Sequence, residues 1–517
     1  MSGRDDLAAG WAMTSLSELL TGIDTGKSFQ CDERPPMNEE VGVVKVSAVS
    51  WGEYREQESK TCLSGDRFNA DYLIRPGDFL FSRANTIELV GACVIARQVT
   101  LRVMLSDKIL RLQFVWDGLK PWLLHFLGSK AGRLQIEALA SGNQESMRNI
   151  GQERLGQIMV PLPPRAEQVR IVGKLEELLP ELEAGVAELK AARTKLQQYR
   201  QSLLKAAAEG ALSAEWRARN PPKETGAELL ARTLRERRAR WEVRQLKRFK
   251  AQGKPEPRDW QSKYTNRDAP DTSQLPLLPS GWVYASIGQC FEVSVGATPS
   301  RKAADYWGDG VPWVSSGEVR FNRISTTRET ITEQGLANSS TQINPAGSVL
   351  LGMIGEGKTR GQVAILDIDA ANNQNCAAIW VPETEVPPEF IYYWLWSRYD
   401  ETRRGSSGNN QPALNKSLVE AMPMPLAPVA EMREVVEQLS VQLSGIEVQE
   451  REIAHLLRLA AAQRQNILRA AFAGQLVPQD PADEPASALL ARIRAERAQR
   501  PAAAKRMRRC PPQPATP

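Results

Sequence analysis

The chain has 517 residues, of which 42% are apolar and 25% charged, an ordinary globular composition long enough for about three domains. It contains no apolar run of the roughly 18 residues that a membrane span requires, and its first residues lack the apolar core of a signal peptide. Six cysteines without a C-x-x-C pair argue against zinc fingers, iron–sulfur clusters and a disulfide framework, so we expect a reduced, cytoplasmic protein without a metal site. Only two histidines occur, His125 and His455, which nearly excludes catalysis by a histidine base.

The charge is unevenly distributed along the chain. Residues 226–267 carry 13 Lys/Arg against 5 Asp/Glu, a net charge of +8, and residues 492–509 carry 8 against 1, a net of +7. The whole chain has a net charge of +5, so the remainder sums to −10. Basic segments suggest a polyanionic partner, although solvated basic helices explain them equally well.

The first part of the chain reads as a compact mixed domain. Short strand-like runs at residues 42–47, 79–81 and 92–95 are separated by turn residues, and a helical stretch follows from Pro121 to Leu139. This pattern predicts a small α/β domain rather than an all-helical one.

A long helix follows this domain. After Pro164, Ala166 and Glu167 open a segment with apolar residues at 3-4 spacing, which predicts a coiled coil of about 45 residues, roughly 67 Å long. The expected seam residues are Val172, Leu175, Leu179, Leu182, Val186, Leu189, Leu196 and Leu203. Pro180 should kink this helix or interrupt its hydrogen bonding. The following basic linker has helical spacing up to Lys250 and becomes proline-rich and extended from Lys254 to Leu278.

The same order then repeats. Residues 160–167 match 424–431, and residues 200–210 match 464–474 at the same offset of 264. The second domain again has strand-like runs, at residues 311–315, 348–351 and 362–366, before a helical stretch from Pro388 to Arg404. The second seam is expected at Val436, Leu439, Leu443, Ile446, Ile453, Leu457, Ala460 and Ile467. An unbroken offset over two seams predicts two helices that pair with each other, antiparallel because one chain must return through a long linker.

The fold class is therefore mixed α/β, with two globular domains joined by two long helices in an antiparallel coiled coil and related by an internal pseudo-twofold repeat. The expected segments are a first domain at residues 1–159, a first helix at 160–212, a basic and proline-rich linker at 213–275, a second domain at 276–423, a second helix at 424–476, and a basic, partly disordered tail at 477–517.

One motif suggests nucleotide chemistry. Gly352 to Thr359 fits the phosphate-loop pattern G-x-x-x-x-G-K-[ST]. That loop works because a helix begins at its lysine and directs backbone amides at phosphate. Here an alternating strand pattern, Gln362 to Leu366, follows instead. A phosphate-loop ATPase therefore stays as an alternative that depends on this motif alone.

Several segments together resemble the specificity (S) subunit of type I restriction–modification enzymes. They are Pro161–Val172 with the seam ending before Gly210 or Gly474, Gly296-Ala-Thr-Pro-Ser300, Tyr306–Gly308, Val311–Ser315 and Asn373-Gln-Asn375. The resemblance covers nearly the whole chain. The first domain departs from it, since it has Gly22-Ile-Asp-Thr-Gly-Lys-Ser28 in place of the Gly-x-Thr-Pro run.

The resemblance implies a non-catalytic reader of double-stranded DNA. Each target recognition domain would bind one half of a bipartite sequence, and the helices would keep the two domains at a fixed separation. Modification subunits, expected to number two, would dock on the helices and carry S-adenosylmethionine. Restriction subunits would add an ATP-driven, Mg-dependent motor and nuclease, so no cofactor, metal or membrane contact is expected for this chain.

The charge of the domains does not by itself predict DNA binding. Residues 1–159 carry 18 Lys/Arg against 20 acids, and residues 276–423 carry 11 against 15. Contact with DNA would then depend on local clusters, with the basic linker and partner subunits adding salt-dependent affinity.

The candidate reading residues are polar or cationic side chains on predicted loops, the types that contact base edges and phosphates. In the first domain they are Lys27, Ser28, Arg83, Asn85, Asn143 and Gln144; in the second they are Thr298, Arg301, Lys302, Lys358, Arg360, Asn409, Asn410 and Gln411. No catalytic residue is predicted. A scaffold whose two domains bind protein rather than DNA remains the third interpretation.

Overall fold

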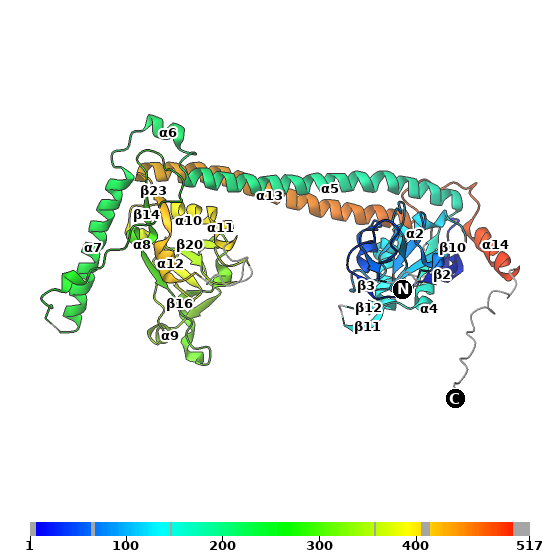
Figure 1. The fold of residues 1–517 in the computed structure, drawn as a ribbon, viewed down its shortest axis with the longest axis horizontal. Coiled ribbons are helices and arrows are strands. Elements are labelled where there is room, and N and C mark those ends of the chain that lie inside the picture. The colour runs from blue at the N-terminus through cyan, green and yellow to red at the C-terminus, as the bar shows by residue number, and fades with distance from the viewer. Residues whose placement is uncertain are drawn as a thin grey trace. The chain divides into compact units, whose positions relative to one another are not determined.

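The computed structural model describes residues 7–63, 68–144, 147–253, 255–355, 358–404 and 414–499. Its contacts divide the chain into two units (Figure 1). The first unit comprises residues 1–189 with 454–517, and the second comprises residues 190–453. Each unit holds one globular domain and a portion of each long helix, and each is described separately.

The first domain is built from short strands and few helices. Its main sheet has the strand order β2-β10-β6-β8, and two smaller sheets have the orders β3-β5-β4-β9 and β11-β12-β7. The elements are β1 (Ala12–Ser15), α1 (Leu16–Leu19), β2 (Leu20–Thr25), β3 (Cys31–Asp32), β4 (Gly42–Val44), β5 (Ser59–Cys62), β6 (Phe79–Ser82), β7 (Ala84–Asn85), β8 (Cys93–Ile95), β9 (Val103–Met104), β10 (Ile109–Phe114), α2 (Leu119–Gly128), α3 (Lys130–Leu139), β11 (Ser141–Gln144), β12 (Met147–Asn149), α4 (Gln152–Gly156) and β13 (Met159–Leu162).

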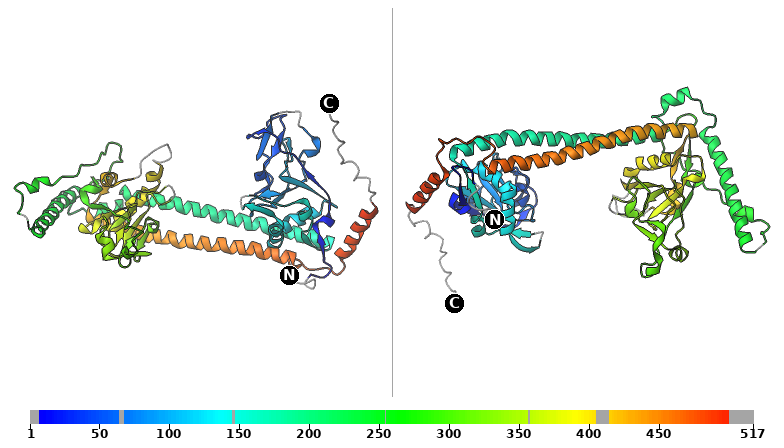
Figure 2. Two further views of the ribbon diagram at one scale, coloured as in Figure 1. Left: turned by 90° about the horizontal axis from the view of Figure 1, so that it is seen from below. Right: turned by 180° about the vertical axis from the view of Figure 1, so that it is seen from behind.

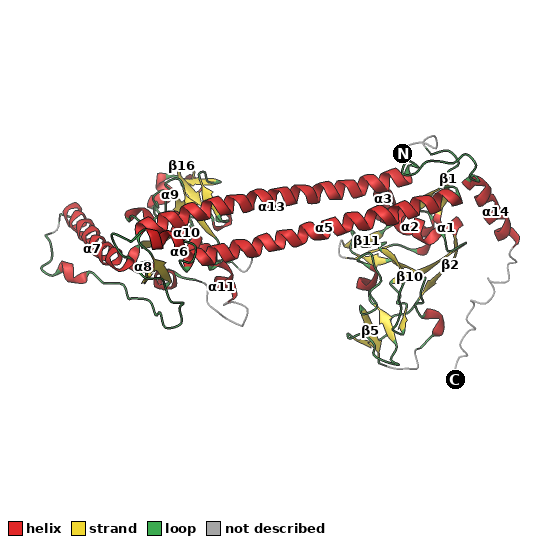
Figure 3. Ribbon diagram, turned by 90° about the horizontal axis from the view of Figure 1, so that it is seen from above, coloured by secondary structure: helices red, strands yellow, loops and turns green. Residues whose placement is uncertain are grey.

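The second domain repeats this plan. Its main sheet has the order β15-β22-β19-β20-β17, so its first four strands correspond to β2-β10-β6-β8. The elements are β14 (Val283–Ser286), α8 (Ile287–Cys290), β15 (Glu292–Val295), β16 (Trp307–Val314), β17 (Asn322–Ile324), β18 (Glu329–Ile331), α9 (Glu333–Ala337), β19 (Val349–Gly352), β20 (Val363–Leu366), β21 (Ala371–Asn372), β22 (Cys376–Trp380), α10 (Pro388–Ser397), α11 (Tyr399–Arg404), α12 (Lys416–Ala421) and β23 (Pro423–Leu426). Figure 3 shows the mixture of helix and strand in both domains.

Both faces of the main sheets are buried. Phe79 and Phe81 of β6 lie in one apolar cluster with Trp122 of α2, while Leu80 between them belongs to a second cluster on the opposite face. In β19, Leu350 likewise contributes to a different cluster from its two neighbours in the sequence. Alternating side chains thus anchor each strand on both faces, and each large apolar side chain contributes roughly 1.5–3 kcal/mol through burial.

Two long helices, α5 (Arg165–Ala208) and α13 (Val429–Phe472), each span 44 residues, which confirms the predicted pair (Figures 1 and 2). Pro180 lies inside α5, which continues through it, so the proline interrupts the hydrogen bonding of the helix at one position without ending it. Pro180 is exposed, and so is Glu176 one turn before it, which lets water bond the carbonyl that the proline leaves without a donor.

The two helices run antiparallel in each unit. In the first unit, Leu175 and Leu179 near the start of α5 share a core with Ile467 and Ala471 near the end of α13. In the second unit, the Arg200 guanidinium lies 2.7 Å from a Glu450 carboxylate oxygen. All sixteen expected seam residues are buried or half-buried.

The end of each long helix docks on the domain of its own unit. Gly210 ends α5 in a left-handed conformation with φ +72°, and a Cβ there would lie 3.1 Å from the ring of Trp282. Gly474 ends α13 with φ +69°, and a Cβ there would lie 3.2 Å from the ring of Trp11. Helices α6 (Ala214–Arg219) and α7 (Gly226–Ala251) follow α5, and α14 (Ala486–Gln499) follows α13.

The repeat therefore extends past the long helices. The Gly226 N–H donates to Gly281 O at 2.7 Å, and the Ala486 N–H donates to Gly10 O at 2.8 Å. Helix α14 occupies part of the segment that was expected to be a partly disordered tail. Among the residues that the structure describes, no helix combines the length and hydropathy of a membrane span.

Candidate nucleic-acid interface

A tightly held loop leaves the main sheet of the second domain after β15. The Ala297 N–H donates to Asn372 O at 3.0 Å. The neighbouring glycine is required sterically, because a Cβ on Gly296 would lie only 1.7 Å from that same carbonyl oxygen. The loop then presents Thr298, whose hydroxyl donates to Gln374 Oε1 at 2.6 Å. Gln374 is exposed, so this pair lies at the surface of a rigid backbone frame.

The frame depends on the buried side chain of Asn372. Its Oδ1 accepts from Asn344 Nδ2 at 2.8 Å, and its amide donates to Asn373 O and Cys376 O at 2.9 and 2.8 Å. Asn372 is 1% exposed, and a buried amide with these partners has a single orientation. The backbone of the Asn373-Gln-Asn375 motif is thereby fixed while the Gln374 side chain points to solvent.

The first domain has the same arrangement with different side chains. The Gly26 N–H donates to Ser106 O at 3.2 Å, and a Cβ on Gly26 would lie 1.8 Å from Leu105 O. The Ser28 hydroxyl donates to the Asp107 carboxylate. Gly26-Lys-Ser28 thus takes the place of Gly296-Ala-Thr298, although the sequence of the first domain lacks the Gly-x-Thr-Pro run.

A second loop adjoins each of these pairs. In the first domain, the Arg83 N–H donates to Lys108 O at 2.9 Å. In the second, the Met353 N–H donates to Asn375 O at 2.8 Å. Both loops close at a glycine with positive φ, Gly91 at +81° and Gly361 at +82°. We name these surfaces the first loop edge (Lys27, Ser28, Arg83, Asp107, Lys108) and the second loop edge (Thr298, Lys358, Arg360, Gln374, Asn375).

The structure brings most of the first-domain candidates together. Strand β12 pairs with β7, which places Arg148 opposite Asn85, and the Arg83 Nε donates to Asn149 Oδ1 at 3.3 Å. Asn143 and Gln144 belong to β11, the outer strand of the same small sheet. Lys27 and Ser28 lie near this sheet because the Ser28 hydroxyl donates to Asp107, and the next residue, Lys108, accepts a hydrogen bond from the Arg83 N–H.

The second-domain candidates are less concentrated. Lys358 is exposed, and the Arg360 Nη2 donates to Thr402 O at 3.2 Å. The Arg301 guanidinium lies 3.7 Å from the centre of the Trp307 ring and bonds Glu329 Oε2 at 2.9 Å. That bond raises the pKa of Arg301, which stays charged and is compensated by the carboxylate of Glu329. Lys302 is exposed beside it, and Asn409, Asn410 and Gln411 lie outside the described residues.

The loop edges also contain residues that were not among the candidates. Gln374 and Asn375 were visible as a motif, and the structure shows that their backbone is fixed opposite Thr298. Asp107, Lys108 and Arg148 carried no sequence signal, because only the strand pairing brings them beside Ser28 and Arg83.

The features that suggested other chemistry have structural explanations. Thr359, Arg360 and Gly361 form a turn that leads directly into β20, so no helix begins at Lys358 to orient backbone amides toward a phosphate. Burial, with smaller contributions from Arg464 and Arg97, lowers the pKa of His125 to about 4. Within the described ranges, no cluster of His, Cys, Asp and Glu is suited to hold a metal ion.

Comparison with known proteins gives consistent matches. A family model described as the type I restriction modification DNA specificity domain matches residues 279–458. The EcoEI specificity subunit of Escherichia coli is 32% identical over 174 residues, which cover 33% of this chain but only 29% of that subunit. The EcoBI specificity subunit of Escherichia coli is 24% identical over 503 residues, covering 94% of this chain and 92% of that subunit.

The fold has a solved counterpart. A chain from a solved type I R-M system matches with a TM-score of 0.60 over 91% of this chain and 99% of its own length, at 17% identity. At this identity the likeness concerns the fold. Together with the family model over residues 279–458 and the curated relatives, it leads to one conclusion: the chain is similar in sequence to type I restriction–modification specificity subunits and shares the fold of a chain from a solved type I R-M system.

Proposed function

We propose that this chain reads a bipartite DNA target in a type I restriction–modification complex, with one half of the target contacted by each loop edge. The observation that carries this proposal is the repetition of the same glycine-closed loop pair on corresponding strands of two domains. Each loop pair presents exposed hydrogen-bonding side chains, so two such pairs could contact the two half-sites of one duplex.

The local charge supports the first loop edge. Lys27, Arg83 and Lys108, with Arg148 beside them, gather around Asp107, which is the one acid in the first loop edge as defined above. A domain with more acids than bases overall can thereby present a cationic surface to phosphates. Several other acids that the structure describes in this domain are engaged in ion pairs, such as Glu33 with Lys60 and Glu40 with Arg34.

The two edges offer different groups to base pairs. In the second edge, Gln374 Oε1 accepts from Thr298, which leaves its amide hydrogens available for an acceptor such as adenine N7. In the first edge, Asp107 accepts from Ser28 and keeps acceptor capacity for a cytosine amino group. The two half-sites should therefore differ in sequence rather than form a perfect palindrome.

The remaining chemistry belongs to partner subunits under this proposal. Two modification subunits would supply S-adenosylmethionine, and restriction subunits would supply ATP hydrolysis, Mg²⁺ and cleavage, all in the cytoplasm. The long helices are the docking elements under this proposal, since their seams are occupied by each other while apolar side chains remain exposed on their outer faces, among them Val169, Val441 and Val448.

Reconstitution tests the proposal. The purified chain alone should neither methylate nor cleave DNA, and addition of its modification subunit should produce methylation confined to one bipartite sequence. Methyl transfer from S-adenosylmethionine by the chain alone would contradict the assignment. So would an assembled complex that methylates without sequence preference.

A further inference from the structure

Helix α7 has two parts that differ in what holds them. Its first part lies against the second domain, past β14 and α8 (Figure 1). It begins at a capping box in which Thr225 and Glu228 satisfy each other's backbone amides. A Cβ on Gly226 would lie 2.2 Å from Leu426 O, so the helix starts in direct contact with the domain.

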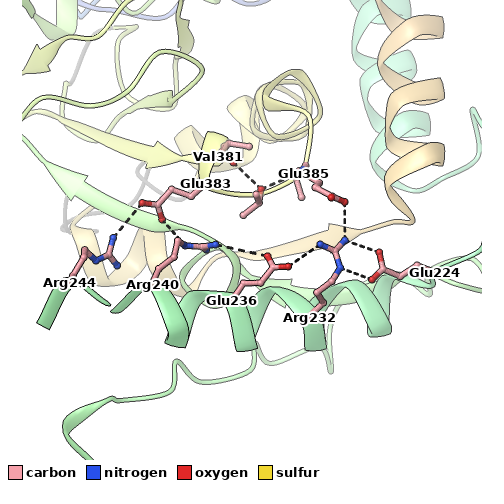
Figure 4. A network of polar contacts seen from close by, with 10 residues as sticks. Glu224, Arg232, Glu236, Arg240, Arg244, Val381, Glu383 and Glu385 are labelled. Atoms are coloured by element: carbon pink, nitrogen blue, oxygen red, sulfur yellow. Dashed lines mark hydrogen bonds and ion pairs between the residues drawn. The ribbon is translucent and has the colours of Figure 1, made fainter. Parts of the chain in front are cut away.

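A ladder of ion pairs fixes this first part (Figure 4). Arg232 bonds both oxygens of Glu224 at 2.9 Å and reaches Glu385 at 3.0 Å. Arg240 and Arg244 lie 3.5 and 3.4 Å from Glu383. The arginines of this part of the helix therefore serve largely to attach it to an acidic side of the second domain.

The last turns of α7 lack such partners. Lys247, Arg248 and Lys250 are exposed, and none of them forms an ion pair with another residue that the structure describes. No acid occurs between Val243 and Gly253. We name these three cations the α7 tip. No described carboxylate compensates their charge, and by sequence the chain is net acidic apart from its two basic segments.

The α7 tip is nevertheless rigidly supported. Trp260, which is 5% exposed, stacks on Trp241 with ring centres 5.7 Å apart and contacts Phe249 edge-on at 5.8 Å. The segment after the helix thus folds back and holds the final turns. The aromatic cluster restrains the backbone at the end of α7 more than a solvated helix end requires. Cations on a restrained backbone lose less conformational entropy when they bind a partner.

The matching helix of the other unit shows that docking does not require the tip. In α14, Arg492 bonds both oxygens of Glu484, as Arg232 bonds Glu224, and Arg494 bonds Glu18. That helix has 14 residues against the 26 of α7. The first 14 residues of α7 correspond to the described residues of α14, so a helix of this length is enough to form ion pairs that attach it to its domain.

We infer that the α7 tip binds the phosphates of the DNA duplex outside the half-site read by the second domain. The inference rests on the proposed function for the presence of DNA. The chemistry fits backbone contact alone, since the tip offers only cations, and its aromatic side chains are occupied with each other rather than free to stack on bases. An acidic surface of a partner subunit is the competing occupant, and the experiment separates the two.

The test uses the assembled methyltransferase with Lys247, Arg248 and Lys250 changed together to Gln, a helix-compatible residue. If all three cations contact phosphates, the slope of log affinity against log salt falls by about 2.7, and affinity near 0.1 M salt falls roughly 10- to 100-fold. The loss should be equal for duplexes with and without the target, and the methylated sequence should not change. Shortening the duplex on one side only should weaken the unaltered complex and leave the variant unaffected.

A matched variant with Arg75, Lys130 and Lys223 changed to Gln removes the same charge from exposed positions outside the loop edges, the α7 tip and the long helices. It should leave the salt slope nearly unchanged. An unchanged slope in the tip variant would overturn the inference, and weakened subunit assembly with normal DNA binding would assign the tip to a protein partner. If the unaltered complex shows no target preference, the proposed function fails instead, and the slope still reports on the tip.

Discussion

The two domains use the same backbone frame and present different side chains on it. Thr298 donates to an amide in the second domain, whereas Ser28 donates to a carboxylate in the first. The glycines that close the frame, Gly296 and Gly26, are retained in both. Backbone sterics thus fix the position of the exposed groups in each loop edge, while the chemistry of these groups differs between the two domains.

Substitution of the glycines that close the frame should have the largest effect on the stability of the two domains. Gly296→Ala places a methyl group against Asn372 O and should destabilise the second domain by about 3 kcal/mol or more. Gly26→Ala should do the same for the first domain through Leu105 O. Thermal unfolding and half-site binding of each variant measure the effect. Gly445→Ala, which meets no atom within 4 Å, is the control and should be neutral or stabilising. A Gly296 variant as stable as this control would show that the frame is not rigid.

A second comparison concerns the first turn of each long helix. Glu431 and Glu167 are both 1% exposed and occupy matching positions. Glu431 accepts from Arg217 and Ser213, both at 2.6 Å, whereas Glu167 accepts from the Trp11 indole N–H at 3.0 Å. Burial raises the pKa of Glu167. One glutamate thus anchors a cation and the other only a neutral donor.

Neutralising these glutamates should have opposite effects. Glu431→Gln leaves Arg217 without its partner and should lower the free energy of unfolding by about 2–3 kcal/mol. Glu167→Gln should leave stability near pH 7 unchanged or raised, because a raised folded pKa means that charging this group opposes folding as pH rises. Denaturant unfolding of both variants checks this. Equal losses would show that the two sites are electrostatically alike.

The sequence predicted the large elements well because their signals are periodic. Apolar spacing identified both long helices, and the offset of 264 identified the repeat. Pro180 does not end α5, since a proline on an exposed helix face removes one hydrogen bond, as expected, from a helix already held by its seam. The helical stretch after Pro121 is two helices, because Ser129 ends α2 and caps α3.

The reading surfaces were only partly predictable. Thr298, Ser28 and Arg83 were found as polar loop residues, but their partners depend on strand pairing between distant segments. The equivalence of Gly26 and Gly296 was hidden because the flanking residues differ, and only the contact of each glycine with a carbonyl oxygen reveals it. Arg301 has the residue type of a base reader, yet Glu329 and Trp307 already engage it.

Helices α7 and α14 each have an arginine at the matching position, Arg232 and Arg492, and these two arginines differ in how strongly they hold their helix. Arg232 bonds three carboxylates and is 28% exposed, whereas Arg492 bonds one and is 56% exposed. Arg232→Ala should therefore cost about 1–2 kcal/mol, and Arg492→Ala about 0.5 kcal/mol or less. Thermal unfolding near pH 7 compares them, and a larger loss for the Arg492 variant would contradict this ranking.

The effect of Arg232 should also depend on pH. Its hydrogen bond lowers the pKa of Glu224 below the unfolded value of about 4.3. A depressed carboxyl pKa stabilises the folded state above the unfolded pKa, and this contribution is lost as pH falls through the folded pKa. The difference between the unaltered chain and the Arg232 variant should hence shrink toward about pH 3. A difference that persists there would mean that packing, not charge, is responsible.

The smallest expected effect concerns the phosphate-loop motif. Lys358→Ala should leave ATP hydrolysis by the assembled enzyme intact, because the turn leads into β20 rather than a helix. It should reduce the salt slope of DNA binding by about 1 if Lys358 contacts one phosphate. Loss of ATP hydrolysis with unchanged DNA affinity would restore the nucleotide-binding interpretation.

Mapping methylated sites in cells that carry matched variants tests whether each loop edge reads one half-site. Thr298→Ala with Gln374→Ala should relax or change the bases of one half-site and leave the other intact. Ser28→Ala with Asp107→Ala should do the reverse, because the two pairs occupy the same place in different domains. The account predicts two complementary changes. Variants that alter both halves together, or active variants that alter neither, would contradict it.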